Sequence, residues 1–203
     1  MTLRDAIQLF RADLARNFAL QEIEWTPWQA LRAAWSPGIV GVFLLRIGNW
    51  LHAKRWLVTA RLVERLITLV TRNELQMGCR IGPGLVLPDA GIVGISSFAH
   101  IGSNCTFHAF SAIIIPPPAS GTEYLIGDHC TIGRRVRIYG PISLAEGTQV
   151  KDGSVVLISS KRPGVVLSGV PARRRSAVTL DVIRAWNPRK GCPLNTASQA
   201  GAP

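Results

Sequence analysis

From residue 75 onward, large aliphatic or aromatic residues recur every six positions, and we call these residues the anchors. A period of six fits neither the 3.6-residue turn of an α-helix nor the two-residue alternation of a strand. It fits short strands joined by turns, in which each turn of the chain stacks on the one before, and so predicts a β-helix of six-residue repeats. The thirteen anchors are Leu75, Ile81, Leu87, Ile95, Ile101, Phe107, Ile113, Ile126, Ile132, Ile138, Leu144, Val150 and Val156.

A second repeated position, four residues after the anchors, holds small or apolar side chains. Cys79, Cys105 and Cys130 all occupy it, so we interpret them as compact core residues, with a nucleophilic cysteine as the alternative. The four cysteines contain no CxxC pair, and we expect no metal site and no disulfide. Glycine directly follows several anchors, where it would let the backbone turn without a Cβ clash; these glycines are Gly82, Gly102, Gly127 and Gly133.

The first third of the chain follows a helical pattern instead. Apolar residues recur at helical spacing from Ala6 to Leu14, and Ser36-Pro37 forms a plausible cap and first turn for a second helix. Five of the six tryptophans lie in this part and suggest a helix-packing core. We therefore divide the chain into a helical region at 1–73, a coil at 74–173 and a C-terminal tail at 174–203.

The longer interruption of the period, between Ile113 and Ile126, predicts a loop at 114–125 that projects from the coil. Three consecutive prolines, Pro116 to Pro118, stiffen it. A loop on a rigid scaffold can carry binding groups, or it can help subunits to dock, and the sequence favours neither.

The charge distribution bears on partners and location. The formal net charge is +11, and residues 161–203 hold eight basic residues against one acid. Such a tail can meet anionic lipid, nucleic acid or a nucleotide-bearing ligand, or can simply be solvated. The tail has few aromatic residues and no known reader motif, so we expect no nucleic-acid binding. With no signal peptide or spanning segment in the sequence, a cytoplasmic protein is expected, with a membrane-surface role possible through the tail.

Three segments of the coil resemble the serine acetyltransferase family, above all its short members from bacterial exopolysaccharide gene clusters. They are CRIGPGLVLPDAGIVGISSFAHIGSNCTFHAF, IGDHCTIG and GSVVLISSKRPGVVLSGVPAR, and with the helical lead-in PGIVGVFLLRIGNWLHAKRW the match covers roughly residues 37–173. The resemblance implies an α+β fold, in which an N-terminal α-helical segment is followed by a left-handed parallel β-helix of hexapeptide repeats and a basic C-terminal tail. The left-handedness of the β-helix is implied by the family resemblance alone.

Family members transfer acetyl from acetyl-CoA to a hydroxyl, with a histidine as general base steadied by a carboxylate. The match puts Asp89 where the family has that histidine. The family's acid-I-H-P phrase becomes Glu74-Leu75-Gln76-Met77, which keeps the acid and loses the histidine, and Glu123-Tyr124 replaces a His-Pro in the loop. Three expected histidines are thus absent.

Another residue would then have to serve as base. His108 follows an anchor just before the loop and is the candidate replacement, whereas His100 and His129 occupy corner positions expected to face solvent. Asp89 or Glu123 could accept the proton only if desolvation raised its pKa by several units. The candidate catalytic residues are therefore His108, Asp89, Glu74 and Glu123.

Lys151, Lys161 and Arg162, near the far end of the coil, are candidates for binding the phosphates and adenine of acetyl-CoA, the expected co-substrate. The alternative is that these three residues are solvated surface charges.

Two functions follow from the resemblance. The favoured one is an acetyl-CoA-dependent O-acetyltransferase that acts on serine or a sugar-like hydroxyl. The alternative is a catalytically inactive member that serves as a binding or scaffold subunit. Either one implies a homo-oligomer, expected to be a trimer. A complex with cysteine synthase is not expected, because the family members that form it end in isoleucine and this chain ends in proline.

Overall fold

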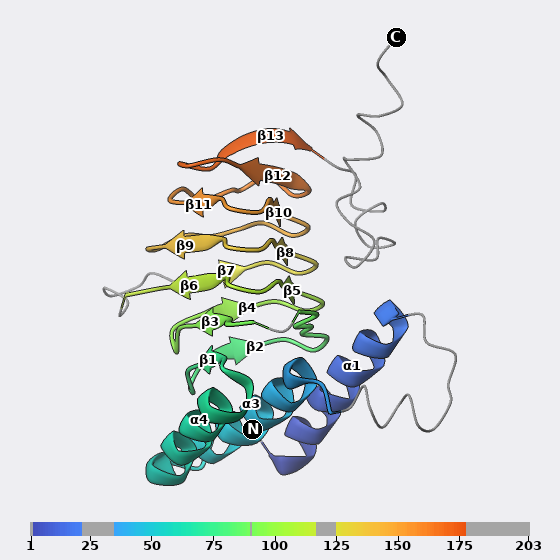
Figure 1. Cartoon of the computed structure of the whole chain (residues 1–203), viewed down its shortest axis with the longest axis vertical. Helices are drawn as coiled ribbons and strands as arrows, with labels where there is room; N and C mark the ends of the chain where they lie inside the picture. Colours follow the sequence, from blue (N-terminus) through green and yellow to red (C-terminus); the bar gives the residue numbers. More distant parts are fainter. Residues whose placement is uncertain (1, 22–34, 90, 117–124, 178–203) are drawn as a thin grey trace.

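The computed structural model describes residues 2–21, 35–89, 91–116 and 125–177. Three helices of this part pack together at one end, and a stack of short strands rises from them (Figure 1). The helices are α1 (Leu3–Gln21), α3 (Pro37–Ala53) and α4 (Leu57–Thr71). Ser36 caps α3 through its side chain, and Pro37 opens it, as the sequence indicates. Within the described ranges, no helix combines the length and the apolar character needed to cross a bilayer.

The strands form three sheets, here called walls A, B and C, which the chain visits in turn. Neighbouring strands in each wall are parallel, apart from the last pair of wall C. Wall A consists of β1 (Glu74–Leu75), β3 (Gly94–Ile95), β6 (Ala112–Ile114), β9 (Arg137–Tyr139) and β11 (Val155–Val156). Wall B consists of β2 (Arg80–Ile81), β4 (His100–Ile101) and β7 (Leu125–Ile126). Wall C consists of β5 (Thr106–Phe107), β8 (Thr131–Ile132), β10 (Gln149–Val150), β12 (Val165–Ser168) and β13 (Arg173–Ala177).

Each anchor lies beside the anchor of the previous turn. Ile95 pairs with Leu75 and Ile113 with Ile95 along wall A, and Phe107 pairs with Ile132 along wall C. All thirteen anchors are buried, as are the cysteines four residues after an anchor. The inward direction that the six-residue period predicts is therefore confirmed.

The glycines that follow the anchors have a different role from the one expected. Their φ angles are not in the left-handed region. A Cβ on Gly82 would lie 2.8 Å from the backbone of Gly102, and one on Gly127 would lie 2.6 Å from the nitrogen of Glu146. These glycines are therefore required by the close approach of the next turn. Positive φ angles occur instead three residues after many anchors; these corner residues include Gly78, Gly84, Asn104, Phe110, His129, Arg135, Gly147 and Gly153.

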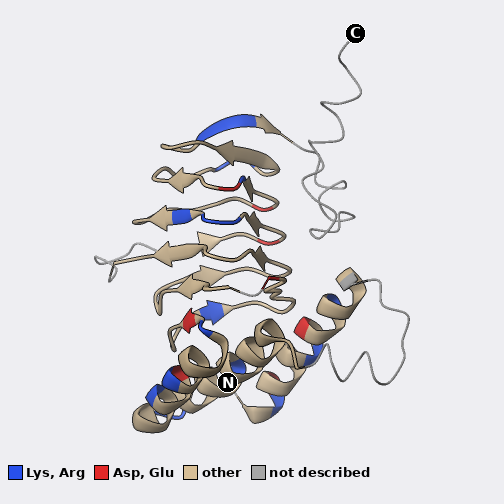
Figure 2. Cartoon of the chain, in the orientation of Figure 1, with Lys and Arg blue, Asp and Glu red and all other residues tan. Residues whose placement is uncertain are grey.

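The coil ends in a hairpin. β13 runs antiparallel to β12 and carries three exposed arginines, Arg173 to Arg175, on the last strand of wall C (Figure 2). Charged side chains on such an edge discourage pairing with strands of other chains.

The helices hold the first turn of the coil through a buried ion pair. Arg46 of α3 and Asp13 of α1 lie 2.9 Å apart, each side chain 3% exposed. Arg46 also donates to the carbonyls of Ile81 and Gly82, and Asp13 accepts from the backbone nitrogens of Gly84 and Leu85. Because each charge has several partners, the pair can be buried without an unsatisfied group.

Trp25 and Trp28 lie outside the described residues, and two of the other tryptophans do not belong to the helix-packing core that the sequence suggests. Trp35 and Trp56 are largely exposed in the described chain. Glycines of α3 allow the helix to lie close to the coil. A Cβ on Gly38 or Gly48 would collide with Leu87 or Met77 of the coil.

Arg46→Met should destabilise the protein by about 3–5 kcal/mol, because it leaves the Asp13 carboxylate buried without its cation. Urea unfolding measures the change. Arg11→Met, an exposed position on the same helix bundle, is the matched control and should change the free energy of unfolding by less than about 0.5 kcal/mol. Equal stability of the two variants would refute the anchoring role of the pair.

Candidate active site

One corner of the coil, between walls C and A, gathers polar side chains. Residues two positions after the wall C anchors stack there, one from each turn of the chain. In order along the coil they are Asp89, Ala109, Arg134 and Asp152. The short side chain of Ala109 separates Asp89 from Arg134, and the long arginine side chain spans that extra turn.

Asp89 is the centre of this cluster. Arg134 binds it with two hydrogen bonds, from Nε to Oδ2 at 3.0 Å and from Nη2 to Oδ1 at 2.9 Å. His108 places Nδ1 2.8 Å from Oδ2 of the same carboxylate, and the Ala109 backbone nitrogen donates to it at 3.4 Å. The arginine is exposed, whereas the side chains of His108 and Asp89 are 15% and 20% exposed.

These contacts decide the ionisation of Asp89. Partial burial raises its pKa, but the hydrogen bonds from Arg134 and His108 outweigh burial and hold the pKa well below the usual range. Reciprocally, the hydrogen bond to Asp89 raises the pKa of Arg134. An ionised carboxylate only accepts hydrogen bonds, so Nδ1 of His108 carries the proton in this contact. In the neutral imidazole, Nε2 is then the acceptor, which is the form a general base requires.

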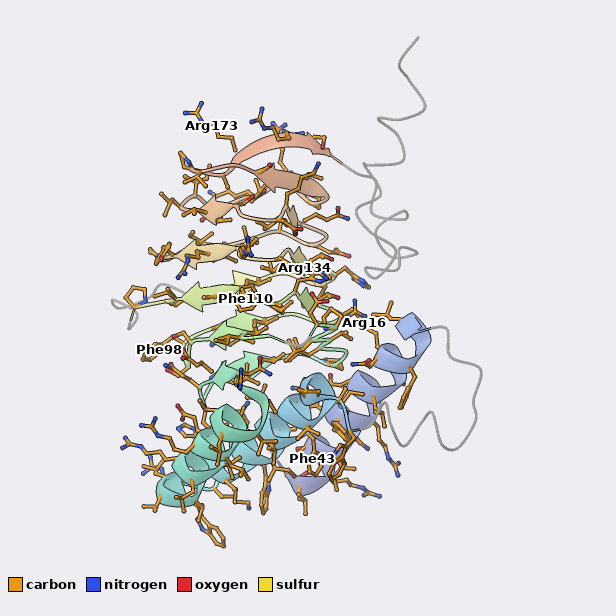
Figure 3. The ribbon with its side chains drawn as sticks, in the orientation of Figure 1. Arg16, Phe43, Phe98, Phe110, Arg134 and Arg173 are labelled. Atoms are coloured by element: carbon orange, nitrogen blue, oxygen red, sulfur yellow. The ribbon has the colours of Figure 1, made fainter. Side chains whose placement is uncertain are left out.

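A groove of about 690 Å³ runs along the same corner. Asp89, Arg134, Arg135 and Asp152 line it, together with Phe110. Arg134 and Phe110 are labelled in Figure 3. The His108 ring is not part of the lining, although the two residues that follow it in the chain, Ala109 and Phe110, are.

The other candidate residues lie elsewhere. Glu74 is exposed on β1 and lines a second hollow on wall A together with Gln76, which accepts a hydrogen bond from the backbone of Ser97. Glu123 lies outside the described residues. The structure thus brings together His108 and Asp89, and no recorded contact joins Glu74 to them.

The basic candidates are divided between two parts of the coil. Lys151 immediately precedes Asp152 of the groove lining. Lys161 and Arg162 are exposed and follow Ser160, which bridges to Leu144 on the wall B side. None of the three has a recorded contact with the Asp89 cluster.

Arg134 is not among the candidate residues predicted from the sequence, although the sequence contains a signal for it. In the hexapeptide register, Asp89 and Arg134 hold the same corner position two turns apart, with a small residue between them. Aligning the turns by their wall C anchors would have placed these opposite charges in one column.

The described cysteines are core residues. Burial raises the pKa of Cys79 to about 11, and a hydrogen bond with Cys105 together with burial raises that of Cys130. Nucleophilic cysteine chemistry requires the opposite, an exposed thiol with a lowered pKa.

Comparison with known proteins shows which proteins this chain is similar to. No family model matches the chain. A serine acetyltransferase from Synechococcus elongatus is 28% identical over 148 residues, which cover 71% of this chain and 60% of that protein. The serine acetyltransferase of Mycobacterium tuberculosis is 25% identical over 138 residues, 68% of this chain and again 60% of the relative. The chain is therefore similar in sequence to serine acetyltransferases. It spans about 60% of the length of these curated relatives.

Solved structures of serine acetyltransferases have a similar fold. The enzyme from Neisseria gonorrhoeae superposes with a TM-score of 0.76 at 21% identity, over 87% of this chain and 68% of that one. The soybean apoenzyme superposes with a TM-score of 0.73 at 25% identity, over 84% of this chain and 69% of the other. Both similarities include the helical end as well as the stacked strands, since they extend over more of the chain than the coil alone.

The buried thiols should be unreactive in the folded protein. In a Cys192→Ser variant, we expect Ellman's reagent to label the native protein at least about 100-fold more slowly than the urea-unfolded protein, because labelling requires local opening. Rapid labelling of one thiol in the native state would contradict this assignment.

Arg134→Gln should raise the pKa of Asp89 towards the ordinary aspartate value, since it removes two hydrogen bonds to the carboxylate. A carboxyl carbon NMR titration measures the midpoint. The folded pKa lies below the unfolded one, so the stability that the cluster contributes is present above about pH 4 and is lost as the pH falls through the folded pKa.

Arg135→Gln is the matched control for this titration. Arg135 lines the same groove but makes no recorded hydrogen bond to Asp89. An Asp89 midpoint that moves equally in the two variants would show that general charge, and not the paired contact, sets its pKa.

Proposed function

We propose that the protein is an acetyl-CoA-dependent O-acetyltransferase that acts on serine or a sugar-like hydroxyl. Sequence similarity to serine acetyltransferases supports the acetyl transfer, and one of the structures similar to this chain is a serine acetyltransferase in complex with CoA. The observation that carries the proposal is the hydrogen bond between His108 and Asp89. It supplies a histidine and carboxylate pair in a chain that has other residues at the positions where the family has histidines.

In the proposed reaction, the acceptor hydroxyl attacks the carbonyl carbon of the acetyl thioester. Nε2 of His108 takes the hydroxyl proton as the new carbon–oxygen bond forms. The carbon–sulfur bond then breaks, and the proton passes to the sulfur, which leaves as the CoA thiol. Asp89 keeps Nδ1 protonated and stabilises the imidazolium that forms.

Arg134 acts on this pair as a positioning residue. Its two hydrogen bonds fix the plane of the Asp89 carboxylate, and that plane in turn fixes the imidazole. Glu74, the carboxylate kept from the family phrase, and Glu123, an alternative base, remain candidate catalytic residues in this proposal. Lys151, Lys161 and Arg162 are proposed to contact the phosphates and adenine of acetyl-CoA.

The proposal also covers the handedness of the coil, the division of the chain and its assembly. We take the coil, residues 74–173, as a left-handed β-helix with the helical region at 1–73 and the basic tail at 174–203. We propose that three copies form a homotrimer in which each active site lies between neighbouring subunits. A neighbour could then complete the groove beside His108, whose ring does not line it in the single chain.

The alternative is an inactive family member that serves as a binding or scaffold subunit. The absent histidines at the family positions favour it. The His108–Asp89 contact favours the enzyme, because a chain that no longer performs catalysis needs no such pair.

His108→Gln should lower kcat for acetyl transfer about 100-fold or more and leave acetyl-CoA affinity within about twofold, since the base acts in the chemical step and not in binding the thioester. Release of CoA thiol with serine as acceptor measures turnover, and calorimetric titration with acetyl-CoA measures affinity. His100→Gln, an outward-facing histidine on wall B, is the control and should leave both quantities unchanged.

Three results would overturn parts of this account. Failure to bind acetyl-CoA at millimolar concentration would favour the inactive scaffold. Binding without thiol release on serine or on sugar acceptors would remove those acceptors from the proposal. Full turnover by the His108→Gln variant would exclude that histidine as the base.

A further inference from the structure

The outer face of α4 combines exposed apolar side chains with arginines. Its inner face, at Ala60, Ile67 and Thr71, is buried against the rest of the helical bundle. On the opposite side Leu69, Val58 and Leu62 are 82%, 75% and 63% exposed. The spacing of these three residues, four and seven positions, keeps them in one row along the helix.

The apolar row continues on one flank of the helix, and a basic row runs along the other. Leu66 and Val70 extend the exposed apolar surface. Arg61, Arg65 and Arg72 share the four- and seven-residue spacing and are all exposed. A helix with adjacent apolar and arginine rows is the pattern of a helix that lies in a membrane interface, where leucines enter the acyl region and arginines reach the headgroups.

The turn that leads into the helix extends this surface. Lys54, Arg55 and Trp56 precede α4 and are exposed, and tryptophan is suited to the boundary between apolar and polar layers. From Lys54 to Arg72 the sequence contains five basic residues and one acid, Glu64, which is half-buried. We call this surface, formed by residues 54–72, the α4 face.

Charge complementarity distinguishes among possible occupants. A second copy of the chain would bring another set of arginines and no exposed carboxylate from its own α4 face. An anionic lipid surface supplies the missing negative charge and also accepts the apolar row. The α4 face lies at the end of the molecule opposite β13, so the arginines of β13 cannot contact the same flat surface (Figures 1 and 2).

We propose that the α4 face binds the surface of anionic membranes and lies in the headgroup region without crossing the bilayer. The coil then projects away from the membrane, and the Asp89 groove lies on the side of the coil. This inference does not depend on the acetyltransferase reaction.

Sedimentation of the full-length protein with vesicles tests the proposal. Vesicles of phosphatidylcholine with about one-third phosphatidylglycerol should carry the protein down, and vesicles of phosphatidylcholine alone should not. Binding should weaken as salt is added, because salt screens the arginines.

Paired variants separate the two rows of the α4 face. Leu62→Gln with Leu69→Gln removes the apolar row, and Arg61→Gln with Arg65→Gln removes most of the basic row. Each pair should weaken partitioning onto the anionic vesicles about tenfold or more. All four side chains are exposed, so circular dichroism and the melting temperature should match those of the wild type.

Arg174→Gln with Arg175→Gln on β13 is the matched control, since it removes the same charge at the opposite end. It should change partitioning by less than about twofold. The proposal is overturned if the wild type stays in solution with anionic vesicles, or if the leucine variant binds as well as the wild type. It is also overturned if the leucine substitutions change only the sedimentation mass of the protein, which would make the α4 face a contact between copies.

Discussion

Burial of one large side chain every six residues is the constraint on which the rest of this structure depends. Each anchor must point into a narrow interior shared by three walls, so successive turns of the chain stack in register. A residue at a given distance from its anchor therefore lies directly above its counterpart in the previous turn. The column of Asp89, Ala109, Arg134 and Asp152 is a consequence of that register, and the candidate active site is built on it.

The helical end closes the first turn of the coil through polar contacts as well as apolar packing. Arg46 and Asp13 satisfy backbone groups of the segment 81–85 that have no earlier turn to pair with. Arg16 of α1 adds hydrogen bonds to the carbonyls of Gly84 and Cys105 and to the hydroxyl of Thr106 (Figure 3). These donors and acceptors orient the helices on the coil, because a hydrogen bond depends on direction and apolar contact does not.

The repeat could be predicted from the sequence, and the details that depend on distant residues could not. The anchors repeat locally, so their burial follows from spacing alone. Arg46 interrupts the apolar stretch of α3, and Asp13 is one of several charged residues in α1, so only the tertiary contact between the two helices explains their burial. The exposure of Trp56 could not be foreseen either, because aromatic composition does not say which face of a helix is covered.

Part of the candidate site was also accessible from the sequence. His108 and Asp89 were both identified, one from its place before the loop and the other from its place in the family motif. Their contact is not a property of either position, since it depends on the stacking of one turn on the next and on the reach of Arg134 from the turn beyond. We infer that this contact holds His108 as the tautomer protonated at Nδ1, with Nε2 available as a base. Nitrogen-15 NMR of the neutral His108 imidazole measures the tautomer directly. We expect a protonated Nδ1 and an unprotonated Nε2, and a proton on Nε2 instead would exclude His108 as a base held by Asp89.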